Sequence, residues 1–333
     1  MMNPAERVIR RVDRYQQTHS WAGFPFAVVK KFGDDQAGNL AALIAYYAIF
    51  SIFPLLLALA TIVGYVLHGH PSWQDAVTTS ALKNLPLMGK NNPLPLHGSI
   101  FALVSGLVLA LWSGLGVAKS AQTAFDTVYL VPKVERPGFP WGLLRALRIV
   151  VLGGLGFIAT TAVSSAVTSV HSIGGLDLGP GLRVIGICVA VALNTGLFLV
   201  LFRWLTIRAV RWRDALPGAV MSAVALQGLQ LASTALIAHK LTSAKATYGN
   251  FAAVIVLMSW FYLQAQVVLL AAEVNVVRQS KLWPRALVDA PATSADYRAY
   301  EAYAEREQYK ADEEVDTAFA DDTEAKRPAT REG

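Results

Sequence analysis

The chain has 333 residues, of which 54% are hydrophobic and only 16% are charged, whereas soluble domains carry roughly 25% charged residues, so the composition argues against a soluble globular protein. Cys188 is the single cysteine, which excludes an intrachain disulfide and a cysteine-rich zinc site. The net charge of +6 does not indicate nucleic-acid binding, because positive charge beside apolar spans is first a signal of membrane topology.

Residues 1–37 are expected to form a cytoplasmic N-terminal segment, and its first 20 residues carry four arginines and lack the apolar region of a cleavable signal peptide. Within it, Trp21–Phe32 mixes aromatic side chains with Lys30 and Lys31. This mixture predicts an amphipathic helix that lies in the membrane interface, on the cytoplasmic side.

A transmembrane domain is expected over residues 38–278. Its first apolar run, Leu40–Leu67, contains no charged residue. As a helix it would reach roughly 40 Å, more than the ~30 Å hydrocarbon core requires. The further apolar runs are Ile100–Ala118, Leu147–Val170, Val184–Leu201, Ala215–Ala238 and Phe251–Val277. The predicted fold is therefore all-α, an integral membrane bundle of six transmembrane helices with an N-terminal interfacial helix.

The basic residues orient this bundle. Outside the tail, alternate segments hold 18 and 5 lysine and arginine residues, respectively. The richer set includes both ends of the chain, so the positive-inside rule predicts cytoplasmic N and C termini, as six spans require. We expect a multi-pass protein of the bacterial inner membrane.

The segment 279–333 is expected to form a cytoplasmic acidic tail. From Asp289 to the end it has 13 acidic and 6 basic residues and few aliphatic ones, which favours disorder. The alternative is a short helix with Tyr297, Tyr300 and Tyr303 along one side.

Two spans carry polar faces. At about 100° per residue, four polar side chains of the sixth span fall within a 60° sector. They are Ser259, Tyr262, Gln266 and Glu273. The first span contributes Asn39, Tyr46 and Thr61, with Tyr47 beside them. Polar groups in spans face protein or a water-filled cavity, so these eight residues are a candidate polar pathway.

Glu273 is the only acidic residue of the sixth span. In a functional interpretation it couples protons or ions, or engages a cationic headgroup. In a structural interpretation it lies near the cytoplasmic interface and pairs with an arginine such as Arg203.

Other spans carry isolated polar and small residues. Asn194, Gln227 and Gln230 are interpreted as interhelical hydrogen-bonding points. Gly106, Ala110, Gly114 and Ala118 recur every four residues, which favours close helix packing over a substrate path.

Four arginines form a dense basic cluster between the fourth and fifth spans: Arg203, Arg208, Arg211 and Arg213. The planar guanidinium suits phosphate, so the cluster is a candidate contact for anionic lipid headgroups. The alternative is that these charges only set the topology.

Four stretches of sequence together resemble the YihY/BrkB family of bacterial inner-membrane proteins. In chain order they are NLAALIAYYAIFSIFPLLL from Asn39, LWSGLGVAKSAQTAFDTVY from Leu111, RWRDALPGA from Arg211 and YGNFAAVIVLMSWFYLQAQVVLLAAEVN from Tyr248. The resemblance covers about Phe32 to Arg278, and the extended N terminus is most similar to the YhjD branch. It implies a six-span helical protein with cytoplasmic ends and links to serum resistance and envelope lipid traffic.

The resemblance also brings an older assignment as ribonuclease BN, now regarded as a misassignment. A zinc phosphodiesterase of that kind needs an HxHxDH cluster to hold two metals. The one HxH here is His68-Gly69-His70, and Ser72 and Trp73 occupy the Asp and His positions. Walker, GxSxG and HExxH motifs are also missing, so we expect no enzyme activity, metal or cofactor.

The leading hypothesis is a transporter or a lipid-handling protein of the cell envelope, such as a flippase or scramblase. The alternative is a non-catalytic membrane scaffold whose tail recruits a partner, and a ribonuclease or other membrane enzyme is the third choice. The expected partners are membrane lipids. Self-association and a cytoplasmic protein bound through the tail are two further partners that the sequence leaves open, and we expect no binding to nucleic acid.

Overall fold

The computed structural model describes residues 4–66, 100–169, 180–248, 251–287 and 292–319 of the chain. Within these ranges it is entirely helical, as the sequence predicts, and contains no strand. The helices are α1 (Pro4–Thr18), α2 (Ser20–Asp34), α3 (Ala37–Val66), α5 (Ile100–Val128), α6 (Trp141–Ser169), α7 (Pro180–Leu205), α8 (Trp212–Tyr248), α9 (Ala252–Gln279) and α10 (Ser294–Arg306). A single 3₁₀ turn, Lys133–Glu135, lies between α5 and α6.

The six long helices α3 and α5–α9 correspond to the six apolar runs, but several extend beyond them. Helix α5 continues past Ala118 to Val128, and α6 begins at Trp141 rather than at Leu147. By length and composition, three described segments could cross a membrane: Val104–Val128, Gly186–Leu205 and Val254–Gln279. Ala37–Ile52 is a shorter apolar helix.

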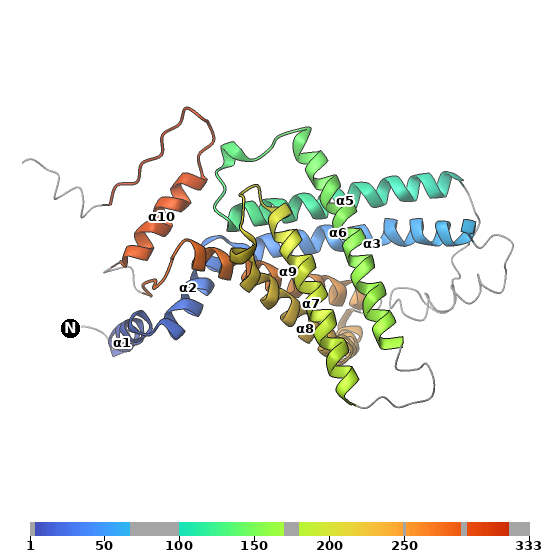
Figure 1. Cartoon of the computed structure of the whole chain (residues 1–333), viewed down its shortest axis with the longest axis horizontal. Coiled ribbons are helices and arrows are strands. Elements are labelled where there is room, and N and C mark those ends of the chain that lie inside the picture. Colours follow the sequence, from blue (N-terminus) through green and yellow to red (C-terminus); the bar gives the residue numbers. More distant parts are fainter. Residues whose placement is uncertain (1–3, 67–99, 170–179, 249–250, 288–291, 320–333) are drawn as a thin grey trace, which may run out of the picture.

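The long helices pack as neighbours around a common centre. Helices α3 and α5 lie side by side along the long axis of the molecule, and α6 and α7 cross this pair at an angle (Figure 1). Helix α9 packs against both α3 and α8. Helices α1, α2 and α10 lie together at one end of the molecule, which we call the terminal end.

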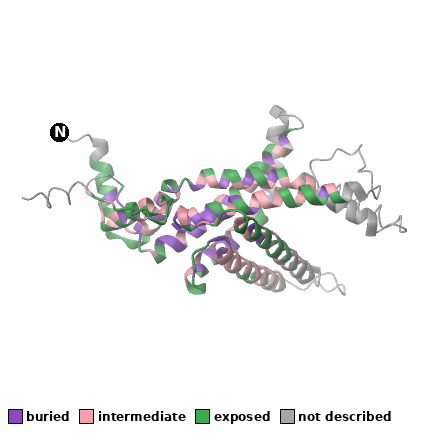
Figure 2. Cartoon of the chain, turned by 90° about the horizontal axis from the view of Figure 1, so that it is seen from above, coloured by how far each residue is buried: buried purple, intermediate pink, exposed green. Residues whose placement is uncertain are grey.

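Alanine dominates the described core. Ten of the described alanines that are fully buried lie on the long helices: Ala37, Ala41, Ala45, Ala124, Ala215, Ala219, Ala223, Ala252, Ala271 and Ala272. Small side chains let helix backbones approach closely, which is how membrane helices gain packing energy. Buried residues gather where the long helices meet near the terminal end, while the outer helix faces are exposed (Figure 2).

One close approach requires a glycine. A side chain at Gly218 of α8 would collide with the carbonyl of Ala271 and the amide of Asn275, both on α9. Gly218 instead donates its backbone N–H to Asn275 Oδ1 at 2.7 Å. Asn275 Nδ2 donates to the Tyr129 hydroxyl and to the Ala215 carbonyl, both at 3.3 Å, so one buried amide joins α8, α9 and the end of α5.

The tail differs from the expectation of disorder for residues 294–306, which form α10. Thr293 and Asp296 make a complete capping box, in which each side chain accepts from the backbone N–H of the other residue. Ala295, Asp296 and Ala299 are buried, so this helix is packed against the protein. The short helix carrying Tyr297, Tyr300 and Tyr303 is therefore the alternative that the structure supports.

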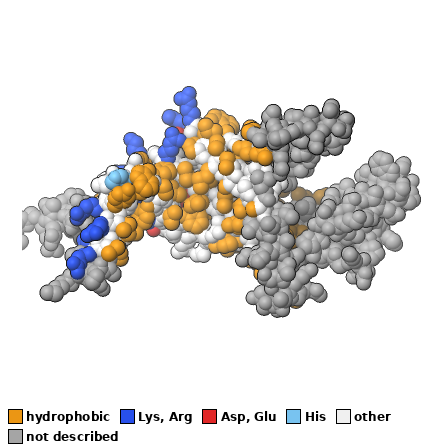
Figure 3. Space-filling view, turned by 90° about the horizontal axis from the view of Figure 1, so that it is seen from below, with side chains coloured by type: hydrophobic (Ala, Val, Ile, Leu, Met, Phe, Trp, Pro, Cys, Tyr) orange, Lys and Arg blue, Asp and Glu red, His pale blue; other side chains and the backbone are white. Residues whose placement is uncertain are grey.

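Helix α2 includes the segment expected to lie in the interface, and one of its faces is buried against protein. Gly23, Ala27, Val28 and Lys31 form that buried face, and α2 packs against α9. Trp21 remains exposed. On the face that Figure 3 shows, apolar side chains are spread over the middle of the molecule, and lysine and arginine side chains lie toward the terminal end.

Candidate functional site

A cavity of about 730 Å³ lies between α3 and α5–α9. Its walls are mostly apolar and include Phe125, Leu197, Phe198, Trp260 and Leu269. Small residues widen it. They are Ala48 on α3, Gly114, Ala118 and Ala121 on α5, Gly153 and Gly154 on α6, and Ala265 on α9. Gly114 and Ala118 belong to the small residues that recur every four positions on the second span. These two line a cavity, whereas the sequence favoured close helix packing for the whole set.

The polar lining of the cavity consists of four carboxamides from three helices. They are Asn194 of α7, Gln227 and Gln230 of α8, and Gln264 of α9. The sequence singled out the first three as interhelical hydrogen-bonding points, but it did not single out Gln264. At about 100° per residue, Gln264 lies roughly 170° from the polar sector of the same helix, so periodicity pointed to the other face.

The predicted polar pathway does not line this cavity at any of its described side chains. Asn39 is exposed at the start of α3, and Tyr46 and Tyr47 are exposed with their rings in edge contact. The Tyr47 ring lies against Gly116 of α5. The side chain of Thr61 lies outside the described part of the structure.

On α9, the predicted sector divides into local contacts and one long-range ion pair. Ser259 is exposed and donates to the carbonyl of Ile255 at 2.8 Å. Gln266 donates to the Tyr262 hydroxyl at 2.9 Å, near Gly38 at the start of α3. Glu273 alone is completely buried.

Glu273 pairs with Lys31 of α2 and not with an arginine such as Arg203. Lys31 Nζ lies 2.8 Å from Glu273 Oε2 and 2.5 Å from Asp35 Oδ2, and all three side chains are fully buried. The ammonium group also donates to the carbonyl of Val128 at 2.8 Å. We call Lys31, Asp35 and Glu273 the buried charge cluster.

Helix α10 completes the charges around this cluster. Arg306 Nη1 lies 2.6 Å from Asp35 Oδ1. Arg285 makes two further ion pairs near the cluster: Nη2 lies 3.0 Å from Asp34 Oδ2, and Nε lies 2.5 Å from Asp296 Oδ1. The ends of the chain are thereby joined, because these ion pairs connect α2 with residues that follow α9.

Asp296 accepts hydrogen bonds from two cationic side chains, Lys30 and Arg285, and from two backbone N–H groups. Burial by itself would raise its pKa, but hydrogen bonds from the backbone N–H groups of Ala286 and Thr293 and from Arg285 outweigh that effect. The pKa of Asp296 therefore lies well below its ordinary value.

The four arginines do not converge on a single described ligand site. The guanidinium of Arg203 stacks 4.4 Å from the centre of the Trp212 ring. Arg208 donates to the carbonyl of Tyr129 at 3.1 Å, while Arg211 and Arg213 are exposed.

Near these arginines, Asp126 accepts hydrogen bonds from Arg145 at 3.4 Å and from the backbone N–H of Ile207 at 3.0 Å. These bonds connect α5 to α6 and to the segment after α7.

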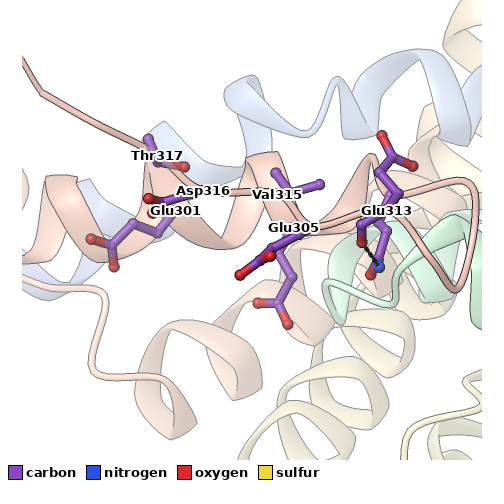
Figure 4. A pocket seen from close by; sticks show the side chains of 8 residues that line it. Glu301, Glu305, Glu313, Val315, Asp316 and Thr317 are labelled. Carbon is purple, nitrogen blue, oxygen red and sulfur yellow. Dashed lines mark hydrogen bonds between the residues drawn. The ribbon is translucent and has the colours of Figure 1, made fainter.

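A second pocket, of about 340 Å³, lies between α10 and the segment that follows it (Figure 4). Its carboxylates belong to Glu301, Glu305, Glu313, Glu314 and Asp316. Among the described residues there is no group of three side chains that could hold a metal ion. His68 and His70 lie outside the described residues.

Comparison with known proteins identifies relatives but no fold precedent. The model of the family described as virulence factor BrkB matches residues 28–295. A UPF0761 membrane protein of a Psychrobacter species is 26% identical, over 84% of this chain and 53% of its own length. A UPF0761 membrane protein of Pseudomonas aeruginosa is also 26% identical, over 79% of this chain and 65% of its own length. No solved structure matches the chain.

This chain spans about half the length of the Psychrobacter relative and about two thirds of the Pseudomonas one. The family match includes α3 and α5–α9, which line the cavity, together with the buried charge cluster. The relatives are membrane proteins by name, and apolar helices long enough to span a bilayer are present here. The chain is therefore a membrane protein that belongs to the BrkB family, the YihY/BrkB family that its sequence motifs resemble.

Proposed function

We propose that the protein is a transporter or lipid-handling protein of the bacterial cell envelope, of the flippase or scramblase type. The observation that carries this proposal is the cavity of about 730 Å³ between the long helices. Its volume is within the roughly 300–1,000 Å³ of small-molecule sites, and it combines apolar walls with a few polar side chains. This is a suitable environment for one part of an amphipathic molecule.

In this proposal α3 and α5–α9 are six spans of the inner membrane. The six helices have 26 to 37 residues each, and about 20 apolar residues are enough to span a bilayer. Helix α10, which follows the sixth long helix, contacts Lys30 of α2 and Asp35 just after it, and such contact between the segments before the first span and after the last one fits an even number of spans. The excess of basic residues in the segments on that side favours cytoplasmic termini.

The arginine cluster has a separate role in the proposal. Arg203, Arg208, Arg211 and Arg213 lie at or near the ends of α7 and α8 and outside the cavity. There they would attract anionic headgroups to the cytoplasmic surface. No residue is assigned a catalytic role.

The test is translocation of fluorescent phospholipids in proteoliposomes, with a variant that fills the cavity. Gly154 lines the cavity, and a Cβ atom added there meets no atom within 4 Å, so the side chain of Gly154→Phe would begin in open space. The adjacent Leu155 is exposed and outside the cavity, so Leu155→Phe is the matched control. We expect wild type and Leu155→Phe to accelerate translocation and Gly154→Phe to lose most of the acceleration.

Two outcomes would count against this function. Wild-type rates equal to those of empty liposomes, with and without ion gradients, would reject a lipid transporter. If Gly154→Phe accelerated translocation as much as wild type does, the cavity would be rejected as the route. The conclusion that the protein moves lipids would remain.

A further inference from the structure

The cavity contains no charged side chain among the described residues that line it. Its polar groups are the side chains of Asn194, Gln227, Gln230 and Gln264, and the remaining lining is apolar or glycine. Both nearby sets of charges, the arginine cluster and the buried charge cluster, lie outside it. Whatever polar group enters the cavity therefore meets uncharged partners, with the four carboxamides among them.

Three of these carboxamides have no partner in the part of the chain that the structure describes. Asn194, Gln227 and Gln264 make no side-chain hydrogen bond there, although each comes from a different helix and lines the same space. Polar groups without partners are costly inside a bilayer. A bound molecule, or water carried with it, would supply the missing partners.

The three carboxamides also lie at similar depth. At about 1.5 Å of rise per residue, Asn194 is roughly 16 Å from the end of α7 at Leu205. By the same measure, Gln227 and Gln264 are each roughly 22 Å from the helix ends nearest the terminal end. All three distances fall within the central half of a ~30 Å hydrocarbon core, and transporters hold their substrates in the interior of the bilayer.

A carboxamide has donors and acceptors but no net charge, so its best match is a group that also has both. A hydroxyl is such a group, since it donates one hydrogen and accepts through two lone pairs. A phosphate only accepts, and its charge calls for arginine or lysine when it leaves water. The lining therefore discriminates between neutral and anionic polar groups.

We infer that the cavity binds a lipid whose headgroup is uncharged and rich in hydroxyls, such as a sugar or another polyol. The inference rests on the proposed function, because it names the substrate class of the same cavity. The carboxamides of α7, α8 and α9 hold the headgroup, and apolar side chains such as Phe198 and Trp260 contact the chains.

The experiment is native mass spectrometry of the full chain in detergent with four lipids that share dioleoyl chains. They are monoglucosyl-dioleoylglycerol, dioleoylglycerol, dioleoylphosphatidylglycerol and dioleoylphosphatidylcholine. Wild type should retain the glucosyl lipid most strongly. Gln227→Leu combined with Gln264→Leu should weaken that retention about fivefold to tenfold, because two hydrogen-bonding groups are removed.

Two comparisons make the result specific. Gln266→Leu removes a carboxamide from α9 outside the cavity, so glucosyl-lipid retention should not change. The double leucine variant should still retain dioleoylglycerol as well as wild type does, because its cavity keeps its shape and becomes more apolar. Loss of both lipids together would overturn the specific role of the carboxamides.

The outcomes separate this inference from the proposed function. If phosphatidylglycerol were retained more strongly than the glucosyl lipid, the inference of an uncharged headgroup would be wrong. The protein would still be a lipid-binding protein. Equal retention of the glucosyl lipid by the double variant would overturn the site. If no lipid is retained but proteoliposomes still move phospholipid, the cavity inference fails alone; if translocation is also missing, both fail.

Discussion

Among individual residues, Lys31 neutralises two buried carboxylates at once. Its ammonium nitrogen lies 2.5 Å from Asp35 and 2.8 Å from Glu273, and no part of the three side chains is exposed. Arg306 provides a second cation for Asp35, whereas Glu273 has no other described cation within ion-pair distance. Glu273 Oε1 has no hydrogen-bond partner among the described atoms, so this carboxylate depends on Lys31.

We therefore predict that Lys31→Met lowers the free energy of unfolding by about 3–5 kcal/mol, because a buried charge loses its partner. Combining it with Glu273→Leu should restore part of the loss, since the unpaired carboxylate is then removed. Chemical unfolding of the purified protein in detergent measures both values. Lys119 is the control, because it is exposed and makes no ion pair in the described structure, so Lys119→Met should cost about 0.5 kcal/mol or less. Equal effects at the two lysines would contradict the prediction.

The sequence presented Lys31 only as a positive charge before the first span. Its partners are Asp35, four residues away on the next turn, and Glu273, near the other end of the chain. Helical spacing could suggest the first contact, but the second depends on how α2 packs against α9. The sequence could not predict which residues line the cavity for the same reason. Helix α9 carries carboxamides on two opposite faces, and periodicity does not say which face meets other helices.

At the scale of elements, α10 is a helix that the amino-acid composition of its segment did not predict. The acidic residues from Asp289 onward favour disorder, yet Ser294–Arg306 is helical and has buried positions. The local signal was present, since Thr293 and Asp296 have the spacing of a capping box. What holds the helix in place is tertiary, namely the contacts of Asp296 with Arg285 and Lys30 and of Arg306 with Asp35. The apolar runs were easier to predict, because a bilayer fixes their length and hydrophobicity.

The lowered pKa of Asp296 makes the docking of α10 dependent on pH in a defined direction. A carboxyl group whose pKa is depressed by folding contributes stability above its ordinary pKa of about 3.9, and that contribution is lost as pH falls toward the folded value. We predict that α10 stays protected from hydrogen exchange from pH 7 down to about pH 4 and loses protection below it. Asp296→Asn should expose α10 already at pH 7, with little further change on acidification.

The control for this measurement is Glu301→Gln on the same helix. Glu301 is exposed and removes the same formal charge when changed, but it makes no ion pair in the described structure. Its exchange rates should therefore match those of wild type. Protection in Asp296→Asn equal to that of wild type at pH 7 would show that the other ion pairs suffice to hold α10.

At the scale of the whole molecule, the contacts between the chain ends constrain the topology. Asp13 accepts from the backbone of Leu287 at 2.8 Å, Gln16 donates to the carbonyl of Arg285 at 2.6 Å, and Lys30 donates to that of Ala286 at 2.6 Å. Because residues 13–30 contact residues 285–287, we predict that these two segments lie on the same side of the membrane. With the basic segments on that side, the positive-inside rule predicts that the side is the cytoplasm.

Cysteine labelling tests this arrangement, with Cys188→Ser as the background because Cys188 is exposed and is the only cysteine. Single cysteines at Arg14 and Glu301 should react with a membrane-impermeant maleimide in inside-out vesicles and stay unlabelled in intact spheroplasts. Lys83→Cys, between the first two predicted spans, should show the reverse pattern. If Arg14→Cys and Glu301→Cys were labelled from opposite sides, the ion pairs between α2 and α10 could not form. An odd number of spans would then replace six, and the same side chains would have to find other partners.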